Sequence, residues 1–179
     1  MLNVLALLST LLLPAPACAQ SAPDALRGKS LVVTWGENRM QRNVGEANFR
    51  AVSASQALRI YVSSAGRVFN RLTFTTRLGT GSTEQVAGDS RASRVPTFIG
   101  QSMTLFMPFP GGGGMRRLVV EFDNAFASCT AKVSNAKEVG GKPQIGRSPI
   151  TKRDIEFRSI TASGERCTIQ AGNIFGGER

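Results

Sequence analysis

The sequence predicts an all-β protein: a single-domain antiparallel sandwich or barrel of about eight strands, with one disulfide. Three observations support this fold class. Apolar and polar residues alternate in short segments, which places every second side chain on one face of a strand. Turn sequences that contain glycine or proline separate these segments. Two cysteines remain after an apparent leader for export, and an even count in an exported chain indicates a disulfide.

The chain opens with MLNVLALLSTLLLPAPACAQ, which has the features of a secretory signal peptide. Residues 4–13 form an apolar run that is too short to span a bilayer. Ala17 and Ala19 then give the small-x-small pattern that signal peptidase cleaves. We therefore expect residues 1–19 to be a signal peptide, with cleavage after Ala19.

This leader predicts a mature protein that begins at Gln20 and resides in the periplasm or outside the cell. The alternative is a lipoprotein anchored through Cys18. The leader has no Lys or Arg, so an upstream start codon also stays open. No transmembrane segment is expected in the mature chain.

The mature chain is expected to form an all-β domain over residues 31–175, between an N-terminal linker at 20–30 and a C-terminal tail at 176–179. Two long stretches rich in turn-forming residues, 80–96 and 140–149, are expected to be loops. The strands are expected at residues 31–35, 57–62, 68–76, 103–109, 117–123, 129–133, 154–159 and 167–171.

The sequence SSAGR predicts a hairpin with a three-residue loop at 64–66, in which Gly66 takes the left-handed position. This loop length sets Val62 opposite Val68 and Leu58 opposite Leu72. Both pairs are apolar, so one face of the hairpin is expected to point into the core.

The other face of this hairpin carries the first candidate site. The same register sets Arg59 opposite Arg71, and Tyr61 opposite Phe69. Like charges directly opposite one another are destabilising. Either a carboxylate from a third strand or solvent offsets this repulsion, or the two guanidinium groups hold a bound anion above the aromatic rings.

The sequence TASGE has the same form and predicts a second hairpin with its loop at 162–164. This hairpin would set Phe157 opposite Ile169, and Cys167 opposite Ser159. Cys167 then lies on the apolar face, so a disulfide formed by this residue is expected to be buried.

The sequence MPFPGGGGMRR is read as a flexible hairpin connection, with a loop at 110–115 that sets Met107 opposite Leu118. A phosphate-binding P-loop requires Gly-Lys-Ser/Thr followed by a helix, but a strand follows here. The alternative is an anion-binding nest of backbone N–H groups assisted by Arg116 and Arg117.

Cys129 and Cys167 are expected to form the disulfide. Closing a loop of this length contributes about 3–4 kcal/mol in the chain-entropy model. Two independent buried thiols are the alternative.

Charge and composition limit the possible functions. The chain has 22 basic and 12 acidic residues, a net charge of +10. Such a balance favours anionic partners, although it also serves solubility. Histidine is absent, which excludes Ser-His-Asp and Cys-His catalysis and any His-ligated zinc site. No metal or other cofactor is expected.

Two carboxylate pairs share strand faces: Glu121 with Asp123, and Asp154 with Glu156. Paired carboxylates hydrolyse glycosides in clefts lined by aromatic rings, but this chain has one Trp and one Tyr. A histidine-free, carboxylate-dependent hydrolase is therefore kept only as an alternative to exposed salt bridges.

The expected function is a non-enzymatic binding or envelope-associated module whose basic surface meets a small anion or an anionic envelope component. Nucleic acid is not an expected partner, because the chain is exported and lacks the signatures of such proteins. A barrel-type carrier of a small apolar ligand is a further alternative. Its interior would be formed by Met103, Met107, Phe122 and Phe74.

Overall fold

The computed structural model describes residues 22–77, 79–85, 96–108, 115–136, 144–148 and 150–176. The leader, with Cys18 and the expected cleavage site at Ala19, lies outside these residues, and so does the glycine run at 111–114. The described chain is almost entirely β-structure with antiparallel pairing. This confirms the predicted fold class.

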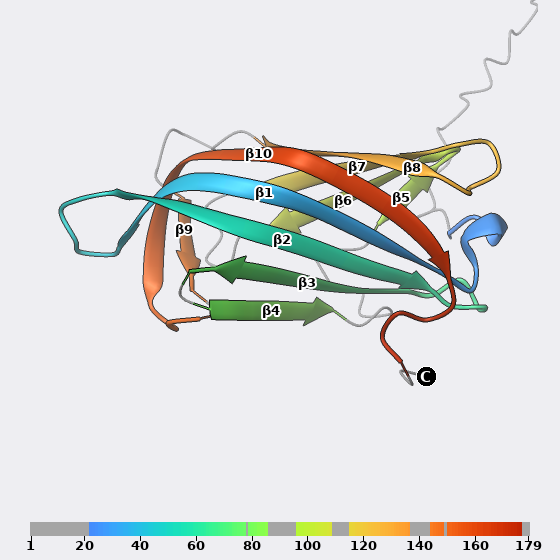
Figure 1. Cartoon of the computed structure of the whole chain (residues 1–179), viewed down its shortest axis with the longest axis horizontal. Coiled ribbons are helices and arrows are strands. Elements are labelled where there is room, and N and C mark those ends of the chain that lie inside the picture. The colour runs from blue at the N-terminus through green and yellow to red at the C-terminus, as the bar shows by residue number, and fades with distance from the viewer. Residues whose placement is uncertain are drawn as a thin grey trace, which may run out of the picture.

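The described residues form two sheets (Figure 1). The larger has six strands in the order β4-β3-β2-β1-β10-β9, and the smaller has four in the order β5-β6-β7-β8. The strands are β1 (Lys29–Asn43), β2 (Arg50–Val62), β3 (Val68–Thr76), β4 (Gly79–Gln85), β5 (Thr97–Ile99), β6 (Ser102–Pro108), β7 (Met115–Phe122), β8 (Cys129–Ala136), β9 (Gln144–Arg147) and β10 (Asp154–Ala171).

The larger sheet curls into a half-barrel, and in Figure 1 the smaller sheet lies behind its strands β1 and β10. Side chains from both sheets form one apolar core. Before β1, the 3-10 turn η1 (Asp24–Leu26) adds the fully buried Leu26 to this core. The strand residues of the core include Leu31, Val33, Trp35, Leu58, Ile60, Val62, Leu72, Met103, Leu105, Met107, Leu118, Val120, Phe122 and Val133.

The β2–β3 hairpin has the predicted register. Val62 pairs with Val68 and Leu58 with Leu72. The turn is closed by the N–H of Gly66, which donates to the carbonyl of Ser63 at 2.9 Å. Gly66 has a φ of +78°, which is the left-handed conformation that the turn requires and glycine adopts without steric cost.

The predicted TASGE hairpin is wrong, because β10 runs unbroken through this sequence from Asp154 to Ala171. Its register with β1 shifts between Thr34 and Gly36, where Ser163 and Arg166 are the facing residues. Gly164, with a φ of +67°, lies in this irregularity. A left-handed glycine serves a bulge as well as a tight turn, and here it accommodates an extra residue in β10.

The predicted β6–β7 register is wrong by two residues. Met107 pairs with Arg116 and not with Leu118, and Leu105 pairs with Leu118. An even shift leaves every side chain on its predicted face, so the apolar contacts of the core persist. The six residues 109–114, which connect the paired Pro108 and Met115, lie outside the described part of the chain.

The two predicted loops contain strands: β4 (Gly79–Gln85) covers the beginning of the first, whose residues 86–95 lie outside the described part of the chain, and β9 begins at Gln144 in the second. Both are edge strands of the larger sheet. The β4 sequence GTGSTEQ has no large apolar residue, so it pairs without the alternation that identified the other strands. β1 also begins at Lys29, inside the expected linker, and continues to Asn43, well past Trp35.

Cys129 and Cys167 form the predicted disulfide, which joins the start of β8 in one sheet to β10 in the other. Both cysteines are partly buried at the edge of the core rather than fully enclosed. The disulfide therefore fixes the two sheets to one another at the side where β8 approaches β10.

Candidate functional site

The inner face of β1 changes character along its length. Leu31, Val33 and Trp35 face the apolar core. The next inward positions are polar and are also buried: Glu37 is 1%, Arg39 9% and Gln41 7% exposed. One half of the protein interior is therefore apolar, and the other contains buried charge. The sequence did not predict this polar half. The expected strand ended at residue 35, because the alternate residues after Trp35 are no longer apolar.

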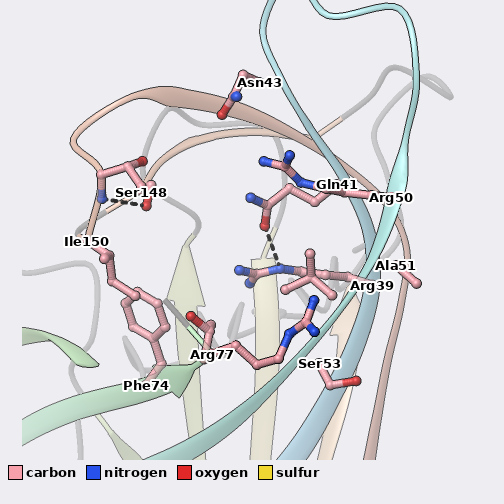
Figure 2. A pocket seen from close by; sticks show the side chains of 13 residues that line it. Arg39, Gln41, Asn43, Arg50, Ala51, Ser53, Phe74, Arg77, Ser148 and Ile150 are labelled. Carbon is pink, nitrogen blue, oxygen red and sulfur yellow. Dashed lines mark hydrogen bonds between the residues drawn. The ribbon is translucent and has the colours of Figure 1, made fainter. Parts of the chain in front are cut away.

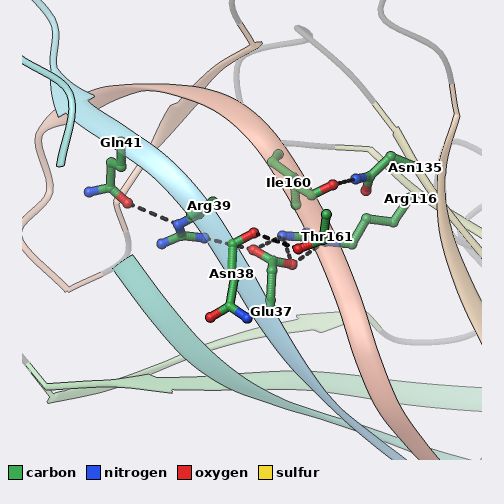
Figure 3. A network of polar contacts seen from close by, with 8 residues as sticks. All are labelled: Glu37, Asn38, Arg39, Gln41, Arg116, Asn135, Ile160 and Thr161. Carbon is green, nitrogen blue, oxygen red and sulfur yellow. Dashed lines mark hydrogen bonds and ion pairs between the residues drawn. The ribbon is translucent and has the colours of Figure 1, made fainter. Parts of the chain in front are cut away.

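A buried ion-pair cluster lies at the boundary between the two halves (Figure 3). Glu37 accepts hydrogen bonds from Nε and Nη2 of Arg116 on β7, both at 2.8 Å. It also accepts one from Nη1 of Arg39 at 3.0 Å. These three side chains carry one negative and two positive charges, so together they sum to +1.

Arg39 is held rigidly by its neighbours. Its Nε donates to Oε1 of Gln41 at 3.0 Å, and its guanidinium lies 4.7 Å from the ring centre of Phe157. Burial lowers the pKa of Arg39, and the charge of Glu37 opposes this effect. Among the contacts between described residues, Nη2 of Arg39 takes part in no hydrogen bond.

Beyond this cluster the half-barrel encloses a pocket of about 560 Å³ (Figure 2). Arg39, Arg50 and Arg77 extend into it from the inner side of β1, from β2 and from the end of β3. Its described lining contains no Asp or Glu. The other lining residues are Gln41, Asn43, Ala51, Val52, Ser53, Phe74, Thr76, Ser148, Ile150 and Thr151.

The pocket exists because the larger sheet nearly closes on itself at this end. The turn that follows β9 reaches the beginning of β4, where Cγ2 of Ile150 would lie 3.9 Å from a Cβ placed on Gly79. This turn is held together by the N–H of Lys152, which donates to the carbonyl of Ser148 at 2.8 Å. Ser148 and Ile150 thereby form the wall opposite β1 and β2.

Arg50 and Arg77 are the exposed cations of the pocket. Neither forms an ion pair or a side-chain hydrogen bond with another described residue. Glu46, in the turn between β1 and β2, accepts from the N–H and side-chain amide of Asn43, and these bonds lower the pKa of Glu46; the charge of Arg50 lowers this pKa further. The mouth of the pocket is therefore cationic.

The structure places the first predicted candidates on the outer face of the larger sheet. Arg59 pairs with Arg71, and Tyr61 with Phe69, in the predicted register. The Tyr61 and Phe69 rings stack at 6.1 Å between centres. These four residues do not line the pocket.

The two arginines of this outer face have local partners. Arg59 donates to Oγ1 of Thr73 at 3.5 Å, and the Arg71 guanidinium lies 5.0 Å from the ring centre of Phe175. The next strand, β4, also places Glu84 directly opposite Arg71 in the backbone register. The sequence left open a carboxylate from a third strand, solvent, or a bound anion to offset the repulsion, and this register is of the kind that the first requires.

Arg116 and Arg117, the candidates beside the glycine run, point to opposite faces of β7. Arg116 is buried against Glu37, while Arg117 is exposed on the outer face of the smaller sheet. They are therefore not brought together with each other or with Arg59 and Arg71, which belong to the larger sheet.

The predicted carboxylate pairs make separate local contacts. Glu121 accepts from Oγ of Ser102 at 2.9 Å, and Glu156 pairs with Nε of Arg42 at 2.5 Å. Asp123 accepts from the backbone N–H groups of Ala127 and Ser128 in its own turn.

The residues suggested for a carrier interior divide between the two halves of the protein. Met103, Met107 and Phe122 belong to the packed core. Phe74 lines the pocket. An apolar ligand would therefore meet one of these four side chains in the pocket.

The described residues contain no group of three or more His, Cys, Asp or Glu side chains placed to hold a metal ion. No helix among them is long and apolar enough to cross a bilayer. Comparison of the chain with protein-family models, with curated proteins and with solved structures gave no match.

Proposed function

We propose that this chain is an exported, non-enzymatic binding protein for an anionic partner, and that the half-barrel pocket is its binding site. The observation that carries the proposal is the charge of the pocket. Arg39, Arg50 and Arg77 line one cavity of about 560 Å³ whose described lining has no acidic residue. Guanidinium groups donate two parallel hydrogen bonds to carboxylates and phosphates, which makes such a site selective for anions.

The buried cluster supports the same proposal. An isolated buried charge is costly unless it is paired. Glu37 is shared between Arg39 and Arg116, so one carboxylate serves two guanidinium groups. An anion at Arg39 would supply a second negative charge on the pocket side.

Export is supported by the leader sequence and by the disulfide. The small-x-small pattern ending at Ala19 predicts a mature terminus at Gln20. The Cys129–Cys167 bond is of a kind that persists in oxidising compartments. N-terminal sequencing of the protein from its own host checks this part of the proposal, and a lipid-modified Cys18 at the terminus would contradict it.

Thermal unfolding of the mature chain in sulfate and in chloride, at matched ionic strength, tests anion binding. Sulfate at about ten times its dissociation constant contributes ~1.4 kcal/mol, which raises Tm by about 3–6 °C for a domain of this size. Because sulfate also stabilises proteins by exclusion from their surfaces, the increment is compared between variants rather than read from the wild type alone.

Two double variants separate the two candidate anion sites. Arg50→Gln with Arg77→Gln removes the exposed cations of the pocket, and Arg59→Gln with Arg71→Gln removes the pair on the outer face. We expect the sulfate increment to shrink in the first and to persist in the second. An undiminished increment in the pocket variant contradicts the proposal. Loss of the increment only in the outer-face variant assigns the anion to Arg59 and Arg71 instead.

A further inference from the structure

The pocket has apolar as well as cationic walls. Phe74 and Ile150 line it from β3 and from the turn after β9, and Figure 2 shows both across the cavity from Arg39. Val52 of β2 adds a further apolar side chain to the lining. These apolar side chains add no affinity for an inorganic oxyanion. Burial of apolar surface stabilises a complex only when the ligand also has apolar surface to bury.

The size of the pocket favours the same class of ligand. Pockets of about 300–1,000 Å³ hold organic molecules, typically on apolar walls with a few placed polar groups. The cavity of about 560 Å³ lies within this range. An inorganic phosphate in contact with Arg39 would leave the wall formed by Phe74 and Ile150 without a contact.

Arg39 is suited to anchor an acidic head group at a fixed point. Glu37, Gln41 and the ring of Phe157 hold its guanidinium on three sides. A preorganised donor spends little conformational entropy when a ligand binds. Arg50 and Arg77 are more exposed and have no ion-pair partner among the described residues, so they can close on the same head group.

We infer that the ligand of this pocket is an amphipathic organic anion: a phosphate or carboxylate head group bound by Arg39, Arg50 and Arg77, joined to an apolar body that packs on Phe74 and Ile150. This inference rests on the proposed function and adds the class of ligand to it. It also combines the two kinds of partner that the sequence suggested separately, an anion and a small apolar molecule.

Isothermal titration of the mature chain with phenyl phosphate, inorganic phosphate and phenol tests the inference. Phenyl phosphate has both parts of the expected ligand, and each of the other probes has one. We expect phenyl phosphate to bind at least tenfold more tightly than either, a difference of about 1.4 kcal/mol. Arg50→Gln with Arg77→Gln is expected to weaken both phosphate probes, whereas Arg67→Gln, an exposed arginine in the β2–β3 turn, is expected to weaken neither.

Variants of the apolar wall test the position of the ring. Phe74→Ala should reduce the affinity for phenyl phosphate at least fivefold and leave that for inorganic phosphate unchanged. Ile150→Ser changes a side chain in a turn rather than in a strand, and it should reduce the same preference if Phe74→Ala fails to fold. Phe106→Ala is the matched control, because Phe106 is an exposed ring on the smaller sheet.

The outcomes separate the inference from the proposed function. If both phosphate probes bind equally and both depend on Arg50 and Arg77, the pocket takes simple anions and only the inference fails. If neither phosphate probe binds, the proposed function fails as well. If phenol binds as tightly as phenyl phosphate, the head group contributes nothing and both are contradicted.

Discussion

Arg116 on β7 and Glu37 on β1 form a buried two-pronged ion pair that joins the two sheets. Nε and Nη2 of Arg116 donate to the two carboxylate oxygens of Glu37, each at 2.8 Å. Replacing such a pair with apolar side chains of similar volume is often neutral or stabilising, so stability alone does not account for it. Its structural consequence is to fix the carboxylate that in turn orients Arg39 toward the pocket.

The shared carboxylate predicts an asymmetry between two matched variants. Glu37→Gln removes the carboxylate that Arg39 and Arg116 share, whereas Arg116→Gln leaves Glu37 paired with Arg39. Breaking a buried pair costs about 3–5 kcal/mol. We expect Glu37→Gln to fall in this range and Arg116→Gln to cost less, measured as free energies of unfolding in urea. Equal losses would show that the two arginines do not share one counter-charge.

The turn sequences SSAGR and TASGE show where prediction from sequence succeeds and where it fails. SSAGR determines a local register, and the β2–β3 pairing depends on little else, so it was predicted correctly. TASGE offers the same left-handed glycine, but pairing with the long strand β1 decides between a turn and a bulge. That partner lies more than a hundred residues away, so no local pattern contains the answer.

The pocket could not be predicted for a related reason. Glu37, Arg39 and Gln41 continue the alternation of Leu31, Val33 and Trp35 with polar residues. Polar residues at alternate positions normally indicate an exposed face. The burial of this segment follows only from the three-dimensional structure. β1 is paired on both edges within the larger sheet, and Arg116 of β7 faces the inner side of β1. The sequence offered one signal for a longer strand: every second residue from Leu31 to Gln41 continues the same face.

The bulge in β10 predicts different results for two Gly→Ala variants, one in the bulge at Gly164 and one on β1 at Gly36, which pairs with Ser163. Gly164 has a φ of +67° with no atom near an added Cβ, so Gly164→Ala suffers only backbone strain. Such strain costs about 1–2 kcal/mol. Gly36 has no left-handed φ, and its added Cβ would make ordinary contact with Ser163 at 3.5 Å.

We therefore expect Gly36→Ala to be neutral or slightly stabilising, since alanine reduces the entropy of the unfolded chain. Urea unfolding of both variants provides the measurement. A destabilisation by Gly36→Ala that matched that of Gly164→Ala would argue against the bulge.

Asp123 predicts a pH dependence at the β7–β8 turn. The backbone N–H of Ala127 and the hydroxyl of Ser128 stabilise its ionised form and lower the pKa of Asp123 below its ordinary value. The folded pKa then lies below the unfolded pKa, which is about 3.9. The contribution to stability is present above the unfolded pKa and is lost as pH falls through the folded pKa.

Asp123→Asn should therefore be less stable than the wild type at neutral pH, and the difference should diminish as the pH is lowered below about 4. Paired unfolding curves at several pH values measure this, with Glu121→Gln as the control in the adjacent strand. A difference independent of pH would mean that the carboxylate charge does not hold this turn.

The disulfide between Cys129 and Cys167 predicts that its removal lowers stability without separating the two sheets. Cys129 is the first residue of β8, and Cys167 lies in β10. Near it, the N–H of Val133 donates to Oε1 of Glu165 at 3.3 Å, and the Asn135 side-chain amide donates to the carbonyl of Ile160. These bonds and the shared core keep β8 beside β10 without the sulfur link.

Cys129→Ala with Cys167→Ala should consequently still fold, while losing about 3–4 kcal/mol of unfolding free energy, because the unfolded chain regains the freedom of the closed loop. The free energy of unfolding in urea is measured for this variant and for the oxidised wild type. The wild type unfolded in the presence of a reductant is the matched control. Non-reduced peptide mapping of protein from its own host should link the two cysteines. Two freely alkylatable thiols in that material would contradict both the bond and the oxidising compartment that export requires.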